Sequence, residues 1–309
     1  MIELEDAIKI IEKNVLPINR VKIVNLIDAV NKVVAEDIYS TIDSPPFDRS
    51  PYDGYAYNAN SENRNLKVIG TLYAGDVFNR VLNKNEAVKI MTGGKIPQGA
   101  NCVIKKEDVT IIGDMITLNI KLKEYDNYIF KGEDIKKGQL IINKNQNIGY
   151  DGIGVLASLG ISKVTVYDDL KVGILNTGTE LQDINETLEN GKIYDSNRYT
   201  LYSRLLKLGI QADTICNCSD DILELEKKVK NMLQSVDFLI TTGGVSVGDK
   251  DLIPDVFKKI GATELFWKIN IKPGGACYVG TLGEKLLFGL SGNPHAAIVV
   301  FDNVIVPVI

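Results

Sequence analysis

Histidine is the scarcest of the side chains that commonly catalyse reactions. The chain of 309 residues contains one, His295. A metal centre built from several histidines is therefore excluded. A Ser-His-Asp triad would have to use His295, and no nucleophile-elbow motif accompanies it. Any chemistry must therefore rest on carboxylates, lysines, hydroxyls and backbone amides.

Cysteine is also sparse. The four cysteines are scattered, and the closest two, Cys216 and Cys218, are nearer to each other than the C-x₂₋₄-C spacing typical of zinc sites. We interpret all four as free thiols in a reducing compartment. No apolar run approaches the ~20 residues of a membrane span, and the acidic, amphipathic N-terminus is unlike a signal peptide. The sequence thus predicts a cytoplasmic protein that does not enter a membrane.

The composition is otherwise that of a globular protein. Hydrophobic residues make up 45% and charged residues 24% of the chain, which is long enough for two or three domains. The net charge of −5 argues against nucleic acid as a partner, because nucleic-acid binding needs a basic field.

Three patterns of secondary structure follow one another along the chain. Apolar residues at helical spacing predict helices at 2–15 and 26–35, and a proline-rich loop at 44–51 indicates a domain boundary. The predicted parts are a mixed helical linker region (1–43 and 131–168), a β domain (44–130) and an α/β domain (169–309) with helices on both faces of its sheet. Ligands of such sheets bind at the carboxyl ends of the strands.

Two segments of the α/β domain combine a strand, a glycine-containing loop and a helix start. In 236–251 the strand runs into Thr242-Gly243-Gly244-Val245-Ser246, and in 288–295 it runs into Ser291-Gly292-Asn293-Pro294. Glycine lets the backbone approach a ligand, and helix N-termini favour anions. A tight turn, or Asn293 as an N-cap with Pro294 in the first helical position, would explain the same residues structurally. Two such loops at one edge favour a shared phosphate-bearing ligand.

Carboxylates gather at the same predicted edge. Any one of them could be a helix cap or a solvated charge, but together, beside a phosphate site, they indicate a divalent-cation site of the magnesium kind. The metal ligands predicted from this set are Glu180, Asp221 and Asp251. Lys268 and Lys272 are candidates to bind an oxyanion, or are ordinary surface lysines.

Four motifs, taken in order, resemble those of the molybdopterin molybdenumtransferase family, which includes the gephyrin E domain. They are Pro46-Phe47-Asp48-Arg49-Ser50-Pro51-Tyr52-Asp53-Gly54-Tyr55-Ala56, Lys89-Ile90-Met91-Thr92-Gly93-Gly94-Lys95-Ile96-Pro97-Gln98-Gly99-Ala100, Tyr194-Asp195-Ser196-Asn197-Arg198 and Gly243-Gly244-Val245-Ser246-Val247-Gly248-Asp249. The resemblance runs along nearly the whole chain. It implies a homodimer with a β domain, and a three-layer α/β molybdopterin-binding domain like that of the molybdopterin-adenylating proteins.

The resemblance also implies a reaction and its residues. Adenylylated molybdopterin and molybdate would give molybdenum cofactor and AMP, with magnesium assisting, and the molybdopterin adenylyltransferase and recipient molybdoenzymes would be further partners. The catalytic positions carried over are Asp53, Thr92, Asp134, Glu180, Asp251, Lys268 and Lys272, with Asp53 and Thr92 reaching the partner subunit's site. The ligand-binding positions are Asp195, Ser196, Asn197, Gly243, Gly244, Val245, Ser246, Gly248, Asp249, Ser291, Gly292, Asn293 and Pro294.

The chain departs from the family pattern mainly at the molybdate end. Gly275 and Ala276 stand where the family has the second lysine and proline of K-P-G-K-P, and Ala296 replaces a hydroxyl residue. Thr179 replaces an aspartate and Lys131 an arginine. The family's C-terminal β domain is expected to be absent from this chain. Three interpretations stay open: an active transferase, a non-catalytic molybdopterin-binding or carrier protein, and a scaffold of the same fold.

Overall fold

The computed structural model describes residues 1–245 and 251–309, and the chain divides into two compact units. Unit 1 comprises Met1–Asn19 and Asp168–Ile309, and unit 2 comprises Arg20–Tyr167. The N-terminal helix α1 (Leu4–Asn14) therefore belongs to the α/β unit and not to the linker region predicted for residues 1–43, because its buried Ala7 and Ile11 pack into the core of that unit.

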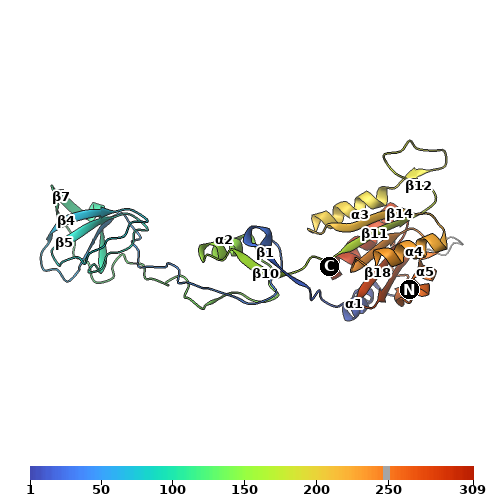
Figure 1. Cartoon of the computed structure of the whole chain (residues 1–309), viewed down its shortest axis with the longest axis horizontal. Helices are drawn as coiled ribbons and strands as arrows, with labels where there is room; N and C mark the ends of the chain where they lie inside the picture. The colour runs from blue at the N-terminus through green and yellow to red at the C-terminus, as the bar shows by residue number, and fades with distance from the viewer. Residues whose placement is uncertain (246–250) are drawn as a thin grey trace. The chain divides into compact units, whose positions relative to one another are not determined.

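Unit 1 is built on a six-stranded mixed sheet with the order β14-β11-β15-β18-β17-β16. Its strands β11, β14 and β18 are labelled in Figure 1. The first four strands are parallel, and β17 runs antiparallel to both of its neighbours. The strands are β11 (Val172–Thr177), β14 (Ala212–Cys218), β15 (Phe238–Thr242), β16 (Thr263–Trp267), β17 (Cys277–Leu282) and β18 (Lys285–Leu290). The predicted alternation of strand and helix is confirmed.

Helices cover both faces of this sheet, as the period-two alternation of strand side chains requires. Ile174 lies in a core shared with α1, α3 (Ser196–Lys207) and α6 (Pro294–Val300), whereas the adjacent Leu175 lies in a second core with α4 (Ile222–Met232) and α5 (Ile253–Lys259). Beyond α6 the chain ends in the short helices η3 (Phe301–Ile305) and η4 (Val306–Val308). Unit 1 is thus a three-layer α/β structure.

Unit 2 contains a second six-stranded sheet with the order β6-β3-β5-β4-β8-β7, in which only the β4–β5 pair is parallel. Its strands are β3 (Gly54–Tyr57), β4 (Asn65–Leu72), β5 (Glu86–Ile90), β6 (Cys102–Lys105), β7 (Val109–Ile112) and β8 (Met115–Leu118). The turn predicted at Ile112–Met115 closes the β7–β8 hairpin. The other elements are β1 (Val21–Asn25) paired with β10 (Lys163–Tyr167), β2 (Ile38–Tyr39) paired with β9 (Leu140–Ile142), the single-turn helix η2 (Lys106–Asp108), and α2 (Tyr150–Ser158).

One local prediction was wrong. The segment 26–35 forms only a single 3₁₀ turn, η1 (Leu26–Ala29), because Asn31 adopts a positive φ of 61° and Val33 and Val34 form β-bridges instead. Within the described ranges, no helix combines the length and the apolar character that crossing a bilayer requires.

Candidate functional site

The loops that follow β11, β15 and β18 meet at one edge of the unit 1 sheet. Asn176, Thr242 and Leu290 are register partners near the ends of these parallel strands. The amide of Gly243 donates to the carbonyl of Leu290 at 3.0 Å. A Cβ atom on Gly243 would lie 2.3 Å from the carbonyl oxygen of Thr177, so glycine is required where the first two loops come together.

The glycine-rich loop after β15 is partly described. Gly243 and Gly244 both adopt left-handed conformations, with φ of 86° and 64°, and the carbonyl of Gly244 accepts a hydrogen bond from the amide of Ile253, the first residue of α5. Val245 is buried. The other predicted ligand-binding residues of this loop, Ser246, Gly248 and Asp249, lie outside the described residues.

The loop after β18 packs directly against the first one. A Cβ atom on Gly292 would lie 3.5 Å from Cα of Gly243. Asn293 is the N-cap of α6, and its side chain accepts from the amides of His295 (3.0 Å) and Ala296 (3.2 Å). The interpretation of Asn293 as an N-cap is confirmed. The two amides at this helix start are already occupied by a side chain of the same loop, which argues against their binding an anion.

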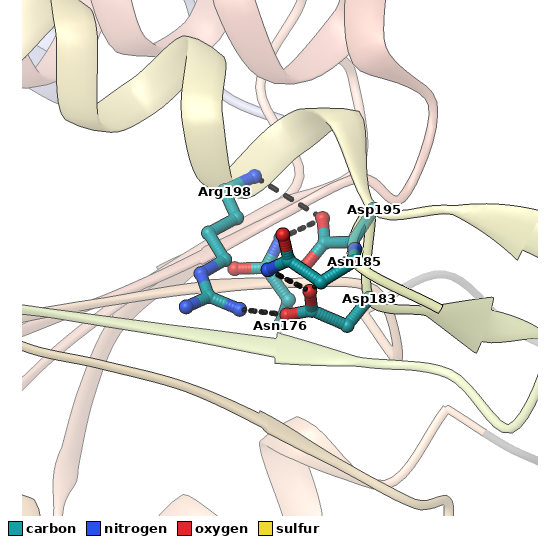
Figure 2. Close-up of polar contacts among 5 residues, drawn as sticks. All are labelled: Asn176, Asp183, Asn185, Asp195 and Arg198. Carbon is teal, nitrogen blue, oxygen red and sulfur yellow. Dashed lines mark hydrogen bonds and ion pairs between the residues drawn. The ribbon is translucent and has the colours of Figure 1, made fainter. Parts of the chain in front are cut away.

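Asp195 ends the segment that connects β11 to α3, and it links this segment to the sheet and to α3 (Figure 2). Its Oδ1 accepts from Asn176 Nδ2 at 2.7 Å and from the amide of Arg198 at 3.1 Å, which makes Asp195 the N-cap of α3. Asp195 is 2% exposed, and burial raises the pKa of its carboxyl. In the first turn of α3, Asn197 Nδ2 donates to the carbonyl of Gly292 at 2.8 Å, so α3 also holds the loop after β18.

Arg198 continues this network outward. Its guanidinium lies 3.1 Å from the carboxylate of Asp183, which also accepts from the side chain of Asn185 (Figure 2). Asp183 belongs to the excursion between β12 (Leu181–Gln182) and β13 (Ile193–Tyr194), two short parallel strands. The network therefore attaches this excursion to the start of α3.

The candidate magnesium ligands do not form a cluster. Asp221 is the N-cap of α4 and accepts from the amides of Leu223 and Glu224, at 3.0 and 2.8 Å. Asp220 accepts from the amide and the hydroxyl of Thr179. In the part of the chain that the structure describes, no three His, Cys, Asp or Glu side chains are placed to hold a metal ion. The structure therefore does not bring Glu180, Asp221 and Asp251 together as a donor set.

Of the two predicted lysines, Lys268 directly follows β16 and Lys272 lies in the turn that comes after it. Lys268 has a positive φ of 75°, and its ammonium lies 4.9 Å from the ring centroid of Trp267. The segment from Lys268 folds back on itself, because the amide of Ile269 donates to the carbonyl of Gly275. Lys272 lies within this turn. Gly275, where the family has a lysine, is outside the left-handed region, but an added Cβ would lie 3.3 Å from two carbonyl oxygens.

The remaining candidates lie in unit 2, in two separate contacts. Asp53 Oδ1 accepts from the amide of Thr92 at 2.8 Å and from its hydroxyl at 3.0 Å, and these bonds hold the pKa of Asp53 below its usual value. Asp134 forms a 3.6 Å ion pair with Arg49. Asp53 and Thr92 thus contact each other directly, and their catalytic role stays a prediction.

Sequence reasoning missed Asn176 and Trp267. The side chain of Asn176 is fully buried and holds Asp195, and the indole N–H of Trp267 donates to the carbonyl of Val245 at 3.0 Å. The one available signal for Trp267 was that it is the only tryptophan in the chain.

The fold and the site define a class of protein: a three-layer α/β domain with two glycine loops at the carboxyl edge of its sheet, joined to a separate β-rich unit. Comparisons with known proteins are specific. A family model described as the MoeA N-terminal region, domains I and II, matches residues 2–160, and a model of a probable molybdopterin binding domain matches residues 173–309.

Individual relatives agree. A molybdopterin molybdenumtransferase of Staphylococcus aureus strain COL is 38% identical over 288 residues, covering 91% of this chain and 69% of the relative. One of Staphylococcus epidermidis ATCC 12228 is 37% identical over 315 residues, covering 100% and 75%. The crystal structure of the molybdopterin biosynthesis MoeA protein from Pyrococcus horikoshii OT3 matches with a TM-score of 0.83 at 31% identity, covering 99% of this chain and 77% of that one.

The chain therefore belongs to the molybdopterin molybdenumtransferase family, and the predicted resemblance is confirmed. This membership makes it an enzyme of molybdenum cofactor biosynthesis, a transferase.

Proposed function

We propose that this chain inserts molybdenum from molybdate into adenylylated molybdopterin and releases AMP. The observation that carries the proposal is the meeting of three loops at one sheet edge, where Gly243 contacts both the strand end at Thr177 and the loop of Gly292. Such close backbone approach suits a phosphate-bearing ligand. The family supplies the identity of that ligand, and the free thiols are consistent with a cytoplasmic reaction.

The proposed roles of the side chains follow from their charge. Lys268 and Lys272 would attract the molybdate oxyanion, while Glu180 and Asp251 would orient the group that attacks the phosphoanhydride. Among the described residues, no three His, Cys, Asp or Glu side chains are placed to hold a metal ion, so these proposed roles do not depend on magnesium. The need for magnesium is tested by adding it to the assay and by omitting it.

Assembly of the chain as a homodimer is part of the proposal. Unit 2 exposes apolar side chains that a second copy could cover, among them Ile23 (70% exposed), Ile27 (76%) and Tyr150 (82%). In such a dimer Asp53 and Thr92 would act at the partner subunit's site. The molybdopterin adenylyltransferase would supply the substrate, and molybdoenzymes would receive the product.

The test is AMP release from adenylylated molybdopterin by the purified chain, with and without molybdate and with and without magnesium. Molybdate-dependent release supports the proposal, and Asp251→Ala is expected to abolish it while leaving the fold intact, as judged by circular dichroism. Unchanged turnover in Asp251→Ala would remove Asp251 from the mechanism.

A second function has its own support. Gly275, Ala276 and Ala296 remove a lysine and a hydroxyl that the family uses, which favours a molybdopterin-binding or carrier protein without catalysis. Tight binding of the nucleotide without AMP release would select this alternative, and an absence of nucleotide binding would select a scaffold.

A further inference from the structure

Trp267 contacts two parts of the site, the glycine loop and Lys268. It ends β16, beside Tyr278 of β17, and packs against the core that also contains Val245. Its indole N–H donates to the carbonyl of Val245 at 3.0 Å, and its ring faces the Lys268 ammonium at 4.9 Å. No other tryptophan is present in the chain.

The hydrogen bond from the indole holds Val245, at the start of the glycine loop. Val245 is 1% exposed, and a Cβ atom on Gly289 would lie 2.6 Å from its Cγ1, so Val245 packs tightly against β18 on one side and accepts from Trp267 on the other. A buried carbonyl that loses its donor is left unsatisfied, which costs more than the bond itself contributes. The indole is therefore suited to hold the backbone that follows Gly243 and Gly244.

The ring also fixes the lysine. Lys268 holds a φ of 75°, a conformation that a residue with a side chain adopts only where the surrounding contacts impose it. Its amide is bound to the carbonyl of Cys277 at 2.8 Å. With the backbone fixed and the ammonium over the indole face, the cation–π contact restricts a long side chain that would otherwise sample many rotamers.

From these contacts we infer that Trp267 is a positioning residue, which aligns the Lys268 ammonium with the start of the glycine loop at Gly243, Gly244 and Val245 so that one anionic ligand meets both. The inference rests on the proposed function, since it assigns the anion at the same site. It adds a residue that acts through the Val245 carbonyl and through Lys268 without contacting the reacting atoms.

The single tryptophan makes the test direct. Emission of Trp267, excited at 295 nm, is followed while AMP is titrated into the full chain. We expect a saturable change in emission, which Lys268→Met largely removes. Lys258→Met, which removes an exposed lysine on α5, is the matched control and is expected to respond as the wild type does.

Kinetics supply the second readout. Trp267→Phe keeps a ring beneath Lys268 but removes the donor to Val245, and it is expected to raise KM for adenylylated molybdopterin about tenfold, with kcat within about twofold of wild type. Should Trp267→Phe fail to fold, as judged by circular dichroism, Lys268→Met still decides through the emission titration.

The outcomes separate the inference from the proposed function. If the wild type releases AMP while its emission stays flat and Trp267→Phe has wild-type KM, the positioning role is overturned although the function stands. If the wild type releases no AMP, the proposed function fails, and the AMP titration still decides the inference: a saturable response supports it and a flat one overturns it.

Discussion

Asp195 is a carboxyl group that folding removes from water. Its Oδ1 is fully used by Asn176 and by the amide of Arg198, whereas its buried Oδ2 has no hydrogen-bond partner among the described residues. Burial disfavours the charged form and raises its pKa, although the Arg198 amide, Asn176 and the Arg198 charge oppose the shift. Asp195 therefore takes up a proton more readily in the folded state than in the unfolded state.

The sign of the resulting pH dependence is fixed. Between the unfolded value of 3.8 and the raised folded pKa, the folded state binds more protons, so the contribution of Asp195 to the free energy of unfolding falls as pH rises. In Asp195→Asn, which preserves a good N-cap, this component should vanish. Subtracting the two stability–pH curves from urea unfolding cancels the other carboxyls, and a difference that stays constant above pH 3.8 would contradict the assignment.

Asp195→Ala supplies the matched measurement. It removes the cap of α3 and the partner of the Asn176 amide, and it should lower the free energy of unfolding by about 1–2 kcal/mol more than Asp195→Asn does.

Asp53 has the opposite behaviour. Hydrogen bonds from the amide and the hydroxyl of Thr92 lower its pKa, so its stabilising contribution is present above pH 3.8 and is lost as pH falls through the lowered folded value. Thr92→Val removes the hydroxyl donor and should move the pKa of Asp53 upward, as measured from the carboxyl carbon shift by NMR. Asp183, whose pKa is lowered by the amide of Asn185, serves as the internal reference and should not move.

Among the elements, the turn between β16 and β17 contains one of the departures from the family motifs. It carries Lys268 and Lys272 but has Gly275 in place of a lysine. Gly275→Lys adds charge at a position whose φ suits any residue, although its Cβ must fit 3.3 Å from the carbonyls of Ile269 and Ile271. We expect it to tighten molybdate binding about threefold to tenfold, as an added charge–charge contact of ~1 kcal/mol would do. Isothermal titration measures this.

Gly275→Gln separates charge from side-chain bulk. If glutamine tightens binding as much as lysine, the effect is not electrostatic. If neither changes molybdate affinity, the oxyanion does not bind at this turn.

The elements that sequence predicted well are those with local causes. The glycine loops, the Asn293 cap and the alternation of buried strands with amphipathic helices follow from residues a few positions apart.

The features that the sequence did not predict depend on distant partners. Residues 26–35 have helical spacing, but Val34 pairs with Val166, more than a hundred residues away. Asp221 has a local role instead: it caps α4 through the amides of Leu223 and Glu224, which is one of the two roles that its position allowed beside metal binding. Trp267 gains its importance from Val245, which no local pattern indicates.

At the scale of the whole molecule, the two units have separate hydrophobic cores. Tyr55 and Ile104 belong to a core of unit 2, and Ile174 and Phe288 to a core of unit 1. Each unit is large enough to unfold as its own cooperative structure. Each also carries its own reporter: Trp267 in unit 1, and in unit 2 the buried Cys102, whose thiol pKa is raised by burial to about 12.

We therefore expect two transitions in urea, with the loss of native Trp267 emission and the appearance of Cys102 reactivity at different midpoints. Cysteine labelling read by mass spectrometry identifies Cys102 among the four thiols. Midpoints that coincide for both probes would show that the units unfold as one.

The division of the chain also sets an order for its synthesis. The helix α1 emerges from the ribosome before unit 2, yet the residues that share the core of Ala7 and Ile11 begin at Val172 and continue to Ile305. All of unit 2 is translated in between. Domains fold as units while they are made, so unit 2 can finish before unit 1 has any sheet. The apolar face of α1 is fully covered only when η3 has been made, so the stretch of translation from residue 14 to residue 305 is the one in which a chaperone would find this face exposed.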